Sequence, residues 1–257
     1  MYDIAAVIDQ GKRERQEDAL AFGLHDDRSP GFIVLADGMG GHAAGSTASG
    51  IAVASVHDEL ADALDAGLPE DDKIANLLHS ATLRANTSIA QYVAFNQEAE
   101  GMGTTIVVPL LTKDKLHWAS VGDSPLYHYR NGSLTRLNED HSMAPAFDFL
   151  AEVGLMDEEV ALFHPDRNCL TSALVGEDIP KIDVSSLPVQ LQPDDVILAC
   201  SDGLLFISDE EILNILDAHK SEDSTAISDA LLAEIKELDH PAQDNVSIVV
   251  VKVLKPD

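Results

Sequence analysis

Residues 31–42 read Gly-Phe-Ile-Val-Leu-Ala-Asp-Gly-Met-Gly-Gly-His, and this stretch decides both the fold and the location of the chemistry. Its apolar run predicts a buried strand over 31–36, and the glycines after Asp37 predict a turn over 38–45. The Asp37 carboxylate then lies at the end of a strand. The carbonyl of Gly38 can face the same space, because glycine has no Cβ to block a close approach.

Four further acidic residues lie in comparable turns: Asp18 in Arg-Gln-Glu-Asp, Asp123 in Gly-Asp-Ser, Asp202 in Ser-Asp-Gly and Asp244 in Asp-Asn. Apolar runs precede Asp123 and Asp202, and another follows Asp244. Each turn alone is explained by the need for glycine and polar residues. Together, carboxylates at strand ends are expected to converge in space. Oxygen ligands without accompanying His or Cys sets suit Mg²⁺ or Mn²⁺ rather than Zn²⁺, so the pattern predicts a divalent-metal hydrolase.

A bridging aspartate with further carboxylates can hold two cations about 3.5–4 Å apart, as in phosphoryl-transfer enzymes. This chemistry needs no Ser, Cys or His nucleophile. The sequence agrees, because it has neither a Gly-x-Ser-x-Gly elbow nor a phosphate-binding Gly-x-x-x-x-Gly-Lys-Ser/Thr loop.

Two basic residues near these turns are candidates for binding and proton transfer. Arg13 precedes Glu17 on a polar turn and can bind phosphate through a bidentate contact. With Lys12 and Arg15 beside it, the alternative is an ordinary surface cation. His42 ends the glycine-rich turn and can act as a general acid for a leaving alkoxide, whereas a lone histidine is more often structural.

The composition limits the classes of function. With 45% hydrophobic residues among 257, the chain can bury a full core. Its 45 acidic and 16 basic residues give a formal net charge of −29, which argues against binding nucleic acid or anionic membranes. No apolar run approaches the roughly 18–20 residues of a membrane span. The N-terminus does not resemble a signal peptide, so we expect a cytoplasmic protein. The two cysteines do not form a disulfide framework.

Periodicity predicts strands and helices without a regular βαβ alternation. We expect one domain over 1–257 with an inserted helical and loop segment over 141–180. The predicted strands are 3–8, 31–36, 104–111, 115–121, 126–129, 133–137, 182–187, 195–200 and 245–254. The predicted helices are 46–66, 71–94, 209–218 and about 223–238.

The motifs resemble, in order, those of the metal-dependent Ser/Thr protein phosphatases (the PPM, or type 2C, family), and most closely its bacterial branch. They are Arg13 with Glu17-Asp18, Asp37-Gly38-Met39-Gly40-Gly41-His42, Gly103-Thr104-Thr105, Gly122-Asp123-Ser124, Leu134-Thr135 with Asp140-His141-Ser142, Ser201-Asp202-Gly203 and Asp244-Asn245. The resemblance covers nearly the whole chain.

The resemblance implies an α+β fold: a central antiparallel β-sandwich flanked by helical pairs in four αββα layers, with residues 141–180 as a flap beside the active site. It implies hydrolysis of phosphoserine and phosphothreonine by attack of a metal-bridging water, with two Mn²⁺ or Mg²⁺ ions and a third in bacterial members. We expect a monomer whose partners are phosphorylated proteins and a bacterial Ser/Thr kinase that it opposes.

The resemblance also assigns roles to individual residues. Asp37 bridges two metals, with Asp202 and Asp244 on one and the Gly38 carbonyl on the other. Glu17 and Asp18 act directly or through waters, and Asp123 holds the third metal together with Asp202. The catalytic set is Arg13 for phosphate, His42 as general acid and the bridging Asp37.

Three positions depart from the family pattern: Gln16 replaces an Asn, and Pro125 and Ser172 each replace an Arg. None removes a metal ligand. The loss of two cations predicts weaker binding of acidic phosphopeptides. Two alternatives stay open: a catalytically silent relative that binds phosphoproteins, and a phosphatase for small phosphomonoesters.

Overall fold

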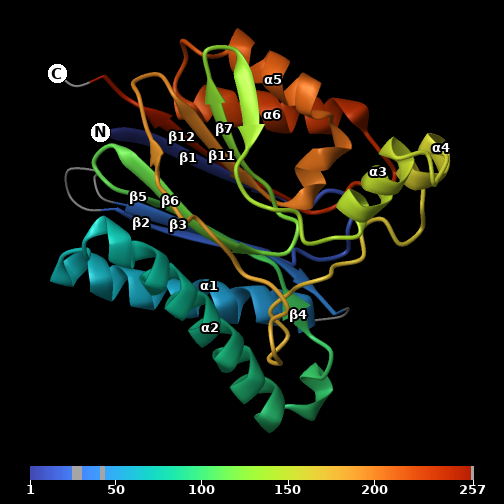
Figure 1. The fold of residues 1–257 in the computed structure, drawn as a ribbon, viewed down its shortest axis with the longest axis horizontal. Coiled ribbons are helices and arrows are strands. Elements are labelled where there is room, and N and C mark those ends of the chain that lie inside the picture. Colours follow the sequence, from blue (N-terminus) through green and yellow to red (C-terminus); the bar gives the residue numbers. More distant parts are fainter. Residues whose placement is uncertain (25–30, 41–43, 256–257) are drawn as a thin grey trace.

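The computed structural model describes residues 1–24, 31–40 and 44–255. Two antiparallel sheets pack face to face (Figure 1). The first has the order β1 (Tyr2–Asp9), β12 (Val246–Val253), β11 (Val196–Cys200), β7 (Leu126–Arg130) and β8 (Ser133–Arg136). The second has the order β10 (Val189–Gln190), β6 (Lys115–Val121), β5 (Ile106–Leu111), β3 (Gly31–Met39) and β2 (Asp18–Leu24), while β4 (Gly103–Thr104) pairs with β3 and β9 (Asp183–Val184) with β6.

Two pairs of helices cover the outer faces of the sheets (Figure 1). Helices α1 (Ala44–Ala66) and α2 (Asp71–Phe95) pack on the second sheet, and α5 (Asp209–Ala218) and α6 (Ser224–Leu238) on the first. Helix α5 begins with a reciprocal capping box between Ser208 and Glu211, which satisfies backbone donors at its N-terminus. The mixed α+β class with antiparallel sheets is as predicted. None of the described helices is both long and apolar enough to cross a bilayer.

Strand β3 is apolar over residues 31–36 because both of its faces are buried there. Phe32 and Val34 pack in the core beneath α1 and α2, whereas Ile33 and Leu35 pack between the two sheets. Strand β12 is likewise buried on both faces in the first sheet, since all eight of its residues are buried. Each fully buried Val or Ile side chain contributes about 1.5–3 kcal/mol through the hydrophobic effect. These two central strands therefore anchor the sandwich.

The strand register brings the predicted acidic turns to one end of the sandwich. Asp18, the first residue of β2, pairs directly with Asp37 near the end of β3. In the first sheet Cys200 pairs with Ile248, so the end of β11, which leads to Asp202, lies beside the start of β12, which follows Asp244. Residues far apart in the sequence thus meet because antiparallel neighbours place one strand's end beside another's start.

Some elements differ from the sequence prediction. Strand β2 was not predicted, because its Asp-Ala-Leu-Ala-Phe-Gly-Leu sequence is rich in residues of low strand propensity. The predicted strand over 104–111 is interrupted at Thr105, which lies between β4 and β5. Over 182–187 only β9 forms. Residues 141–180, called the flap here, hold two short helices, α3 (Ala144–Glu152) and α4 (Glu158–Leu162).

Candidate metal centre

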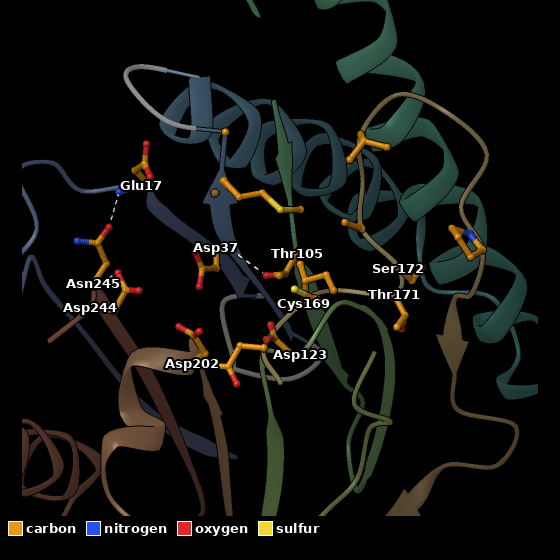
Figure 2. Close-up of a pocket in the computed structure, with 18 of the residues that line it drawn as sticks. Glu17, Asp37, Thr105, Asp123, Cys169, Thr171, Ser172, Asp202, Asp244 and Asn245 are labelled. Atoms are coloured by element: carbon orange, nitrogen blue, oxygen red, sulfur yellow. Dashed lines mark hydrogen bonds between the residues drawn. The ribbon is translucent and has the colours of Figure 1, made fainter. Parts of the chain in front are cut away.

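All of the predicted metal ligands except Asp18 line one cavity of about 840 Å³ at this end of the sandwich. Figure 2 shows Asp37, Asp123 and Asp202 around a common space, with Glu17 and Asp244 to one side. The lining also includes Arg13 and the backbone of Gly38, and it continues along the flap from Asn168 to Pro180. Asp18 is not part of this lining and is only 7% exposed.

Asp37 is held by two threonines of the Gly-Thr-Thr segment. Its backbone N–H donates to Thr105 Oγ1 at 3.1 Å, and its carbonyl accepts from Thr105 N at 2.9 Å and from Thr104 Oγ1 at 2.8 Å. Thr105 Oγ1 also lies 2.8 Å from Ser124 Oγ, beside Asp123. The threonines, which the sequence did not single out as site residues, therefore tie the Asp37 strand to the Asp123 turn.

Asp18 is joined to the opposite sheet through Ser201. The Ser201 hydroxyl donates to Asp18 Oδ2 at 2.7 Å and accepts from Ser247 N at 2.9 Å. The other carboxylate oxygen, Asp18 Oδ1, is buried without a hydrogen-bond partner among the described residues, and so is Asp202 Oδ1. A buried acceptor without a donor is costly, so these oxygens are suited to a ligand that supplies positive charge.

Burial and mutual repulsion raise the pKa of several carboxyls in the cluster. Burial, followed by the charges of Asp123 and Asp244, raises the pKa of Asp202 to about 7. Burial and the nearby Asp202 raise the pKa of Asp37 well above its usual range. Burial and Asp140 raise the pKa of Asp123 to about 6. Each raised pKa means that the ionised carboxylates lack compensating charge in the protein itself.

The donor set fits Mn²⁺ or Mg²⁺, which prefer oxygen ligands. Within residues 1–24, 31–40 and 44–255, no three His, Cys, Asp or Glu side chains are already gathered tightly enough to hold an ion. The buried unpartnered oxygens and the raised pKa values both indicate a cluster that a divalent cation would complete.

Arg13 and Asn245 connect the N-terminal turn to the Asp244 loop. Arg13 forms an ion pair with the Asp244 carboxylate, within reach of the cavity. Asn245 accepts from Glu17 N at 2.7 Å and donates to the carbonyls of Gln10 and Arg15, both at 2.9 Å. Asn245 was quoted in a motif but not predicted as a site residue, because its partners lie more than 200 residues away in the chain.

Gly38 lies where a side chain would not fit. A Cβ at this position would lie 2.2 Å from the carbonyl oxygen of Gly45 and 2.7 Å from that of Glu17. The Gly38 N–H donates to the Glu17 carbonyl at 3.1 Å, and Ser49 Oγ donates to the same oxygen at 2.6 Å. The glycine thus allows α1 and the Glu17 turn to approach the end of β3. His42 lies outside the described residues.

At Gln16 and Pro125, where the sequence departs from the family pattern, other hydrogen bonds still hold the acidic loops in place. Gln16 accepts from Asp18 N at 2.9 Å and donates to the Asp9 carbonyl at 3.2 Å. Pro125 carries no cation, but Arg136 reaches the same turn from the end of β8. Its guanidinium donates to the Asp123 carbonyl at 2.7 Å and to Asp140 Oδ2 at 3.1 Å. The sequence did not indicate this role for Arg136.

Ser172 closes a loop of the flap. Its side chain is buried, and its hydroxyl donates to the Lys181 carbonyl at 2.7 Å and accepts from Lys181 N at 3.1 Å. Asn86 of α2 fixes the same loop by donating to the Glu177 carbonyl at 2.6 Å and accepting from Gly176 N at 2.8 Å. Ser172 therefore stabilises this loop of the flap. At the same time, the loop lacks the Arg that the family pattern has at this position.

Comparisons with known proteins identify relatives over almost the whole chain. Residues 9–235 match the family model described as Protein phosphatase 2C. The chain is 32% identical to the serine/threonine phosphatase stp of Listeria welshimeri over 95% of this chain and 93% of that protein. The crystal structure of the Mycobacterium tuberculosis serine/threonine phosphatase PstP/Ppp superposes with a TM-score of 0.83 at 30% identity, covering 99% of both chains. The catalytic domain of PstP in complex with two manganese ions gives 0.76 at 32% identity, again over 99% of both.

Proposed function

The chain belongs to the protein phosphatase 2C family and is a metal-dependent serine/threonine phosphatase, and from this premise we propose which residues perform the reaction and which phosphoproteins are preferred. The observation that carries the assignment is the convergence of Asp37, Asp123, Asp202 and Asp244 on one cavity. Their partly uncompensated charge supports a role in binding cations rather than in holding the fold together.

In this proposal Asp37 would hold both of two ions, Asp202 and Asp244 would hold one of them, and the Gly38 carbonyl would hold the other. Glu17 and Asp18 would contribute directly or through waters, and Asp123 with Asp202 would hold a third ion. When bound, Mn²⁺ or Mg²⁺ supplies Lewis acidity toward the phosphoryl oxygens and acidifies a water for attack. The protein's share is to present carboxylates from five separate segments at the end of a rigid sandwich.

Arg13 orients the phosphoryl group. One of its guanidinium nitrogens is committed to Asp244, and the remaining donors of its planar fork are available to phosphate oxygens. His42 follows the Asp37 turn in the sequence and, in this proposal, donates a proton to the Ser or Thr Oγ as it leaves. Without the cations the acidic cavity repels a phosphomonoester, so substrate binding depends on metal binding.

The cavity walls support a preference for basic sequences around the phosphoresidue. Glu177 and Asp178 line the cavity where it runs along the flap, and both are exposed. Their carboxylates make no ion pair within the described part of the chain. Arg13 is the only Lys or Arg in the described lining, and it is paired with Asp244. A peptide with Lys or Arg near the phosphothreonine is therefore favoured over one with Glu or Asp.

Opposition to a Ser/Thr kinase, a cytoplasmic location in a bacterium and a monomeric state complete the proposal. The bacterial relatives, such as the Listeria phosphatase, support the bacterial setting on which these expectations rest.

The central test is phosphate release from a phosphothreonine peptide with Mn²⁺, with Mg²⁺ and with EDTA. Asp202→Ala is expected to reduce the metal-dependent rate at least about 1,000-fold, because it removes a ligand on which the chemistry depends. The exposed α1 carboxylate variant Asp65→Ala serves as the control and is expected to keep full activity. If folded wild-type protein releases no phosphate with any metal, the silent-relative alternative is favoured instead.

Substrate choice is tested with two phosphothreonine peptides that differ only in Lys or Glu at the flanking positions. We expect a higher kcat/KM for the Lys peptide, and a loss of this preference in the double variant Glu177→Gln/Asp178→Asn. Hydrolysis of p-nitrophenyl phosphate should be unchanged, because this small substrate does not reach the flap. The matched control Glu158→Gln/Glu159→Gln changes two exposed carboxylates of α4 outside the cavity lining. Equal rates on both peptides would contradict the preference.

A further inference from the structure

Gln243 lies directly before Asp244 and joins two of the acidic loops through its side chain. Its amide Nε2 donates to the Gly203 carbonyl at 3.0 Å and to the Asp244 carbonyl at 3.3 Å. Gly203 follows Asp202 in the chain. One amide group therefore connects the loops that carry two of the proposed metal ligands, although the two loops are about 40 residues apart.

The surrounding loops meet backbone to backbone. A Cβ at Gly203 would lie 2.0 Å from the Asn245 carbonyl oxygen, and one at Gly11 would lie 2.2 Å from that of Asp244. Lys12 N donates to the Gln243 carbonyl at 2.9 Å, which adds the turn that carries Arg13. Because glycines let these segments touch, the relative position of the loops depends on a few hydrogen bonds across the junction. The Gln243 side chain supplies one of them, to Gly203, and its second bond fixes the amide to the Asp244 carbonyl of its own loop.

The cost of placing an amide here indicates that its donors matter. Gln243 is only 4% exposed, and its Oε1 is buried without a partner among the described residues. A position that served packing alone would be filled better by an apolar side chain such as Met or Leu, which buries no amide oxygen without a donor. The amide thus buries one oxygen without a partner, while its NH₂ group donates to two backbone carbonyls of the acidic loops.

We propose that Gln243 is a positioning residue that sets the spacing of Asp202 and Asp244 and thereby the affinity for the divalent cation. The inference rests on the proposed function, in which these two carboxylates bind the same ion. Gln243 acts through the backbone of both loops and does not itself contact the ion or the substrate.

The test is calorimetric binding of Mn²⁺ alone to the full chain, which requires no turnover. Gln243→Met keeps the length and volume of the side chain and removes both donors. We expect its Kd for Mn²⁺ to rise about tenfold, the lower end of what loss of an outer-shell hydrogen bond costs a metal site. At saturating Mn²⁺ the KM for a phosphothreonine peptide should stay close to wild type. The matched control is Gln190→Met, which removes a similar side-chain bond to the Asp114 carbonyl in a strand of the other sheet.

A second variant separates geometry from charge and covers the case in which Gln243→Met does not fold. Gln243→Glu keeps the shape but directs an anion at two carbonyl oxygens, so it should also weaken Mn²⁺ binding. A purely electrostatic effect of the added charge would strengthen it. A folded variant that binds Mn²⁺ as tightly as wild type, or more tightly, overturns the inference, even if its metal-free Tm is lower. Failure of the wild type to bind Mn²⁺ would overturn the metal site itself and this inference with it.

Discussion

A buried aspartate, Asp195, precedes strand β11, and a partly buried one, Asp202, follows it; the surroundings of these two carboxylates differ. Asp195, directly before the strand, is 1% exposed and accepts from Arg130 Nε at 2.7 Å and Nη2 at 2.5 Å. Its Oδ2 also accepts from Gln192 N at 2.8 Å and lies 3.1 Å from His128 Nε2. Although burial alone acts in the other direction, the bonds from Arg130 and His128 lower the pKa of Asp195 to about 2.

Asp202, beyond the other end of the same strand, has no such partner. Burial and neighbouring carboxylates raise its pKa to about 7, and its Oδ1 has no hydrogen-bond donor among the described residues. The comparison shows how the surroundings of a carboxylate distinguish a structural role from a candidate functional one. The protein itself supplies the countercharge of Asp195, whereas in the proposed function the countercharge of Asp202 is a bound cation.

The largest expected effect on stability comes from removing the Asp195 carboxylate, whose charge is compensated within the protein. Asp195→Ala leaves the Arg130 guanidinium without its carboxylate and should cost about 3 kcal/mol, as for other buried pairs that lose one partner. Urea unfolding measures this loss, which should be similar with and without Mn²⁺. A loss no greater than that of the exposed-site control Asp65→Ala would show that the two ends of β11 do not differ as described.

A substitution of Asp202, at the other end of β11, is expected to change the free energy of unfolding in the opposite direction. Asp202→Asn removes a charge from a repulsive cluster and should stabilise the metal-free protein by about 2 kcal/mol at pH 8, since a pKa raised by about three units reflects a cost of ionisation in the folded state. The same variant should lose the stabilisation that Mn²⁺ gives to wild type. Destabilisation of the metal-free protein would argue that Asp202 supports the fold.

The pH dependence of stability sharpens the comparison further. Because the folded-state pKa of Asp202 is about 7, its proton-linked stability is fully present below about pH 4 and is lost as the pH rises through 7. Burial lowers the pKa of His117 and His141, so these two residues act in the opposite direction and add stability as the pH rises to about 7. Because both histidines are also present in Asp202→Asn, metal-free wild type is expected to lose about 1 kcal/mol relative to that variant between pH 6.5 and 8.

Thermal or urea unfolding in EDTA at the two pH values checks this decrease, with Asp202→Asn as the variant that should lack it. The same pH dependence in wild type and in Asp202→Asn would contradict the raised pKa of Asp202. Asp195 adds nothing over this interval, because its pKa is lowered and it stays ionised throughout.

Much of the fold could be predicted because its central strands are unambiguous. The apolar runs before Asp37 and after Asp244 form β3 and β12. Strand β2 could not be predicted from its alanines and glycine, since it becomes a strand by pairing along β3. The convergence of Asp37, Asp123, Asp202 and Asp244 was predicted, and the structure places all four in one cavity lining.

The residues that support the acidic cluster were harder to find. Thr105, Ser201, Asn245 and Gln243 are small or neutral polar residues, which are common in turns for many reasons. Their importance comes from partners that the linear order does not reveal, such as the bond between Ser201 and Asp18, 183 residues apart. Arg136 likewise supports the Asp123 turn from a strand in which nothing in the local pattern indicates that role.

The amino-acid sequence by itself determined the class of chemistry, because carboxylates set beside glycine turns and apolar runs can be recognised wherever they occur along the chain. Only the tertiary structure decided which of these carboxylates are left without a countercharge. Asp195 and Asp202 look alike as acidic residues at the ends of a strand. They differ because Arg130 and His128 face one of them across the sheet, whereas other aspartates surround the second. Charge compensation depends on distance and burial, and both are set when the strands pair.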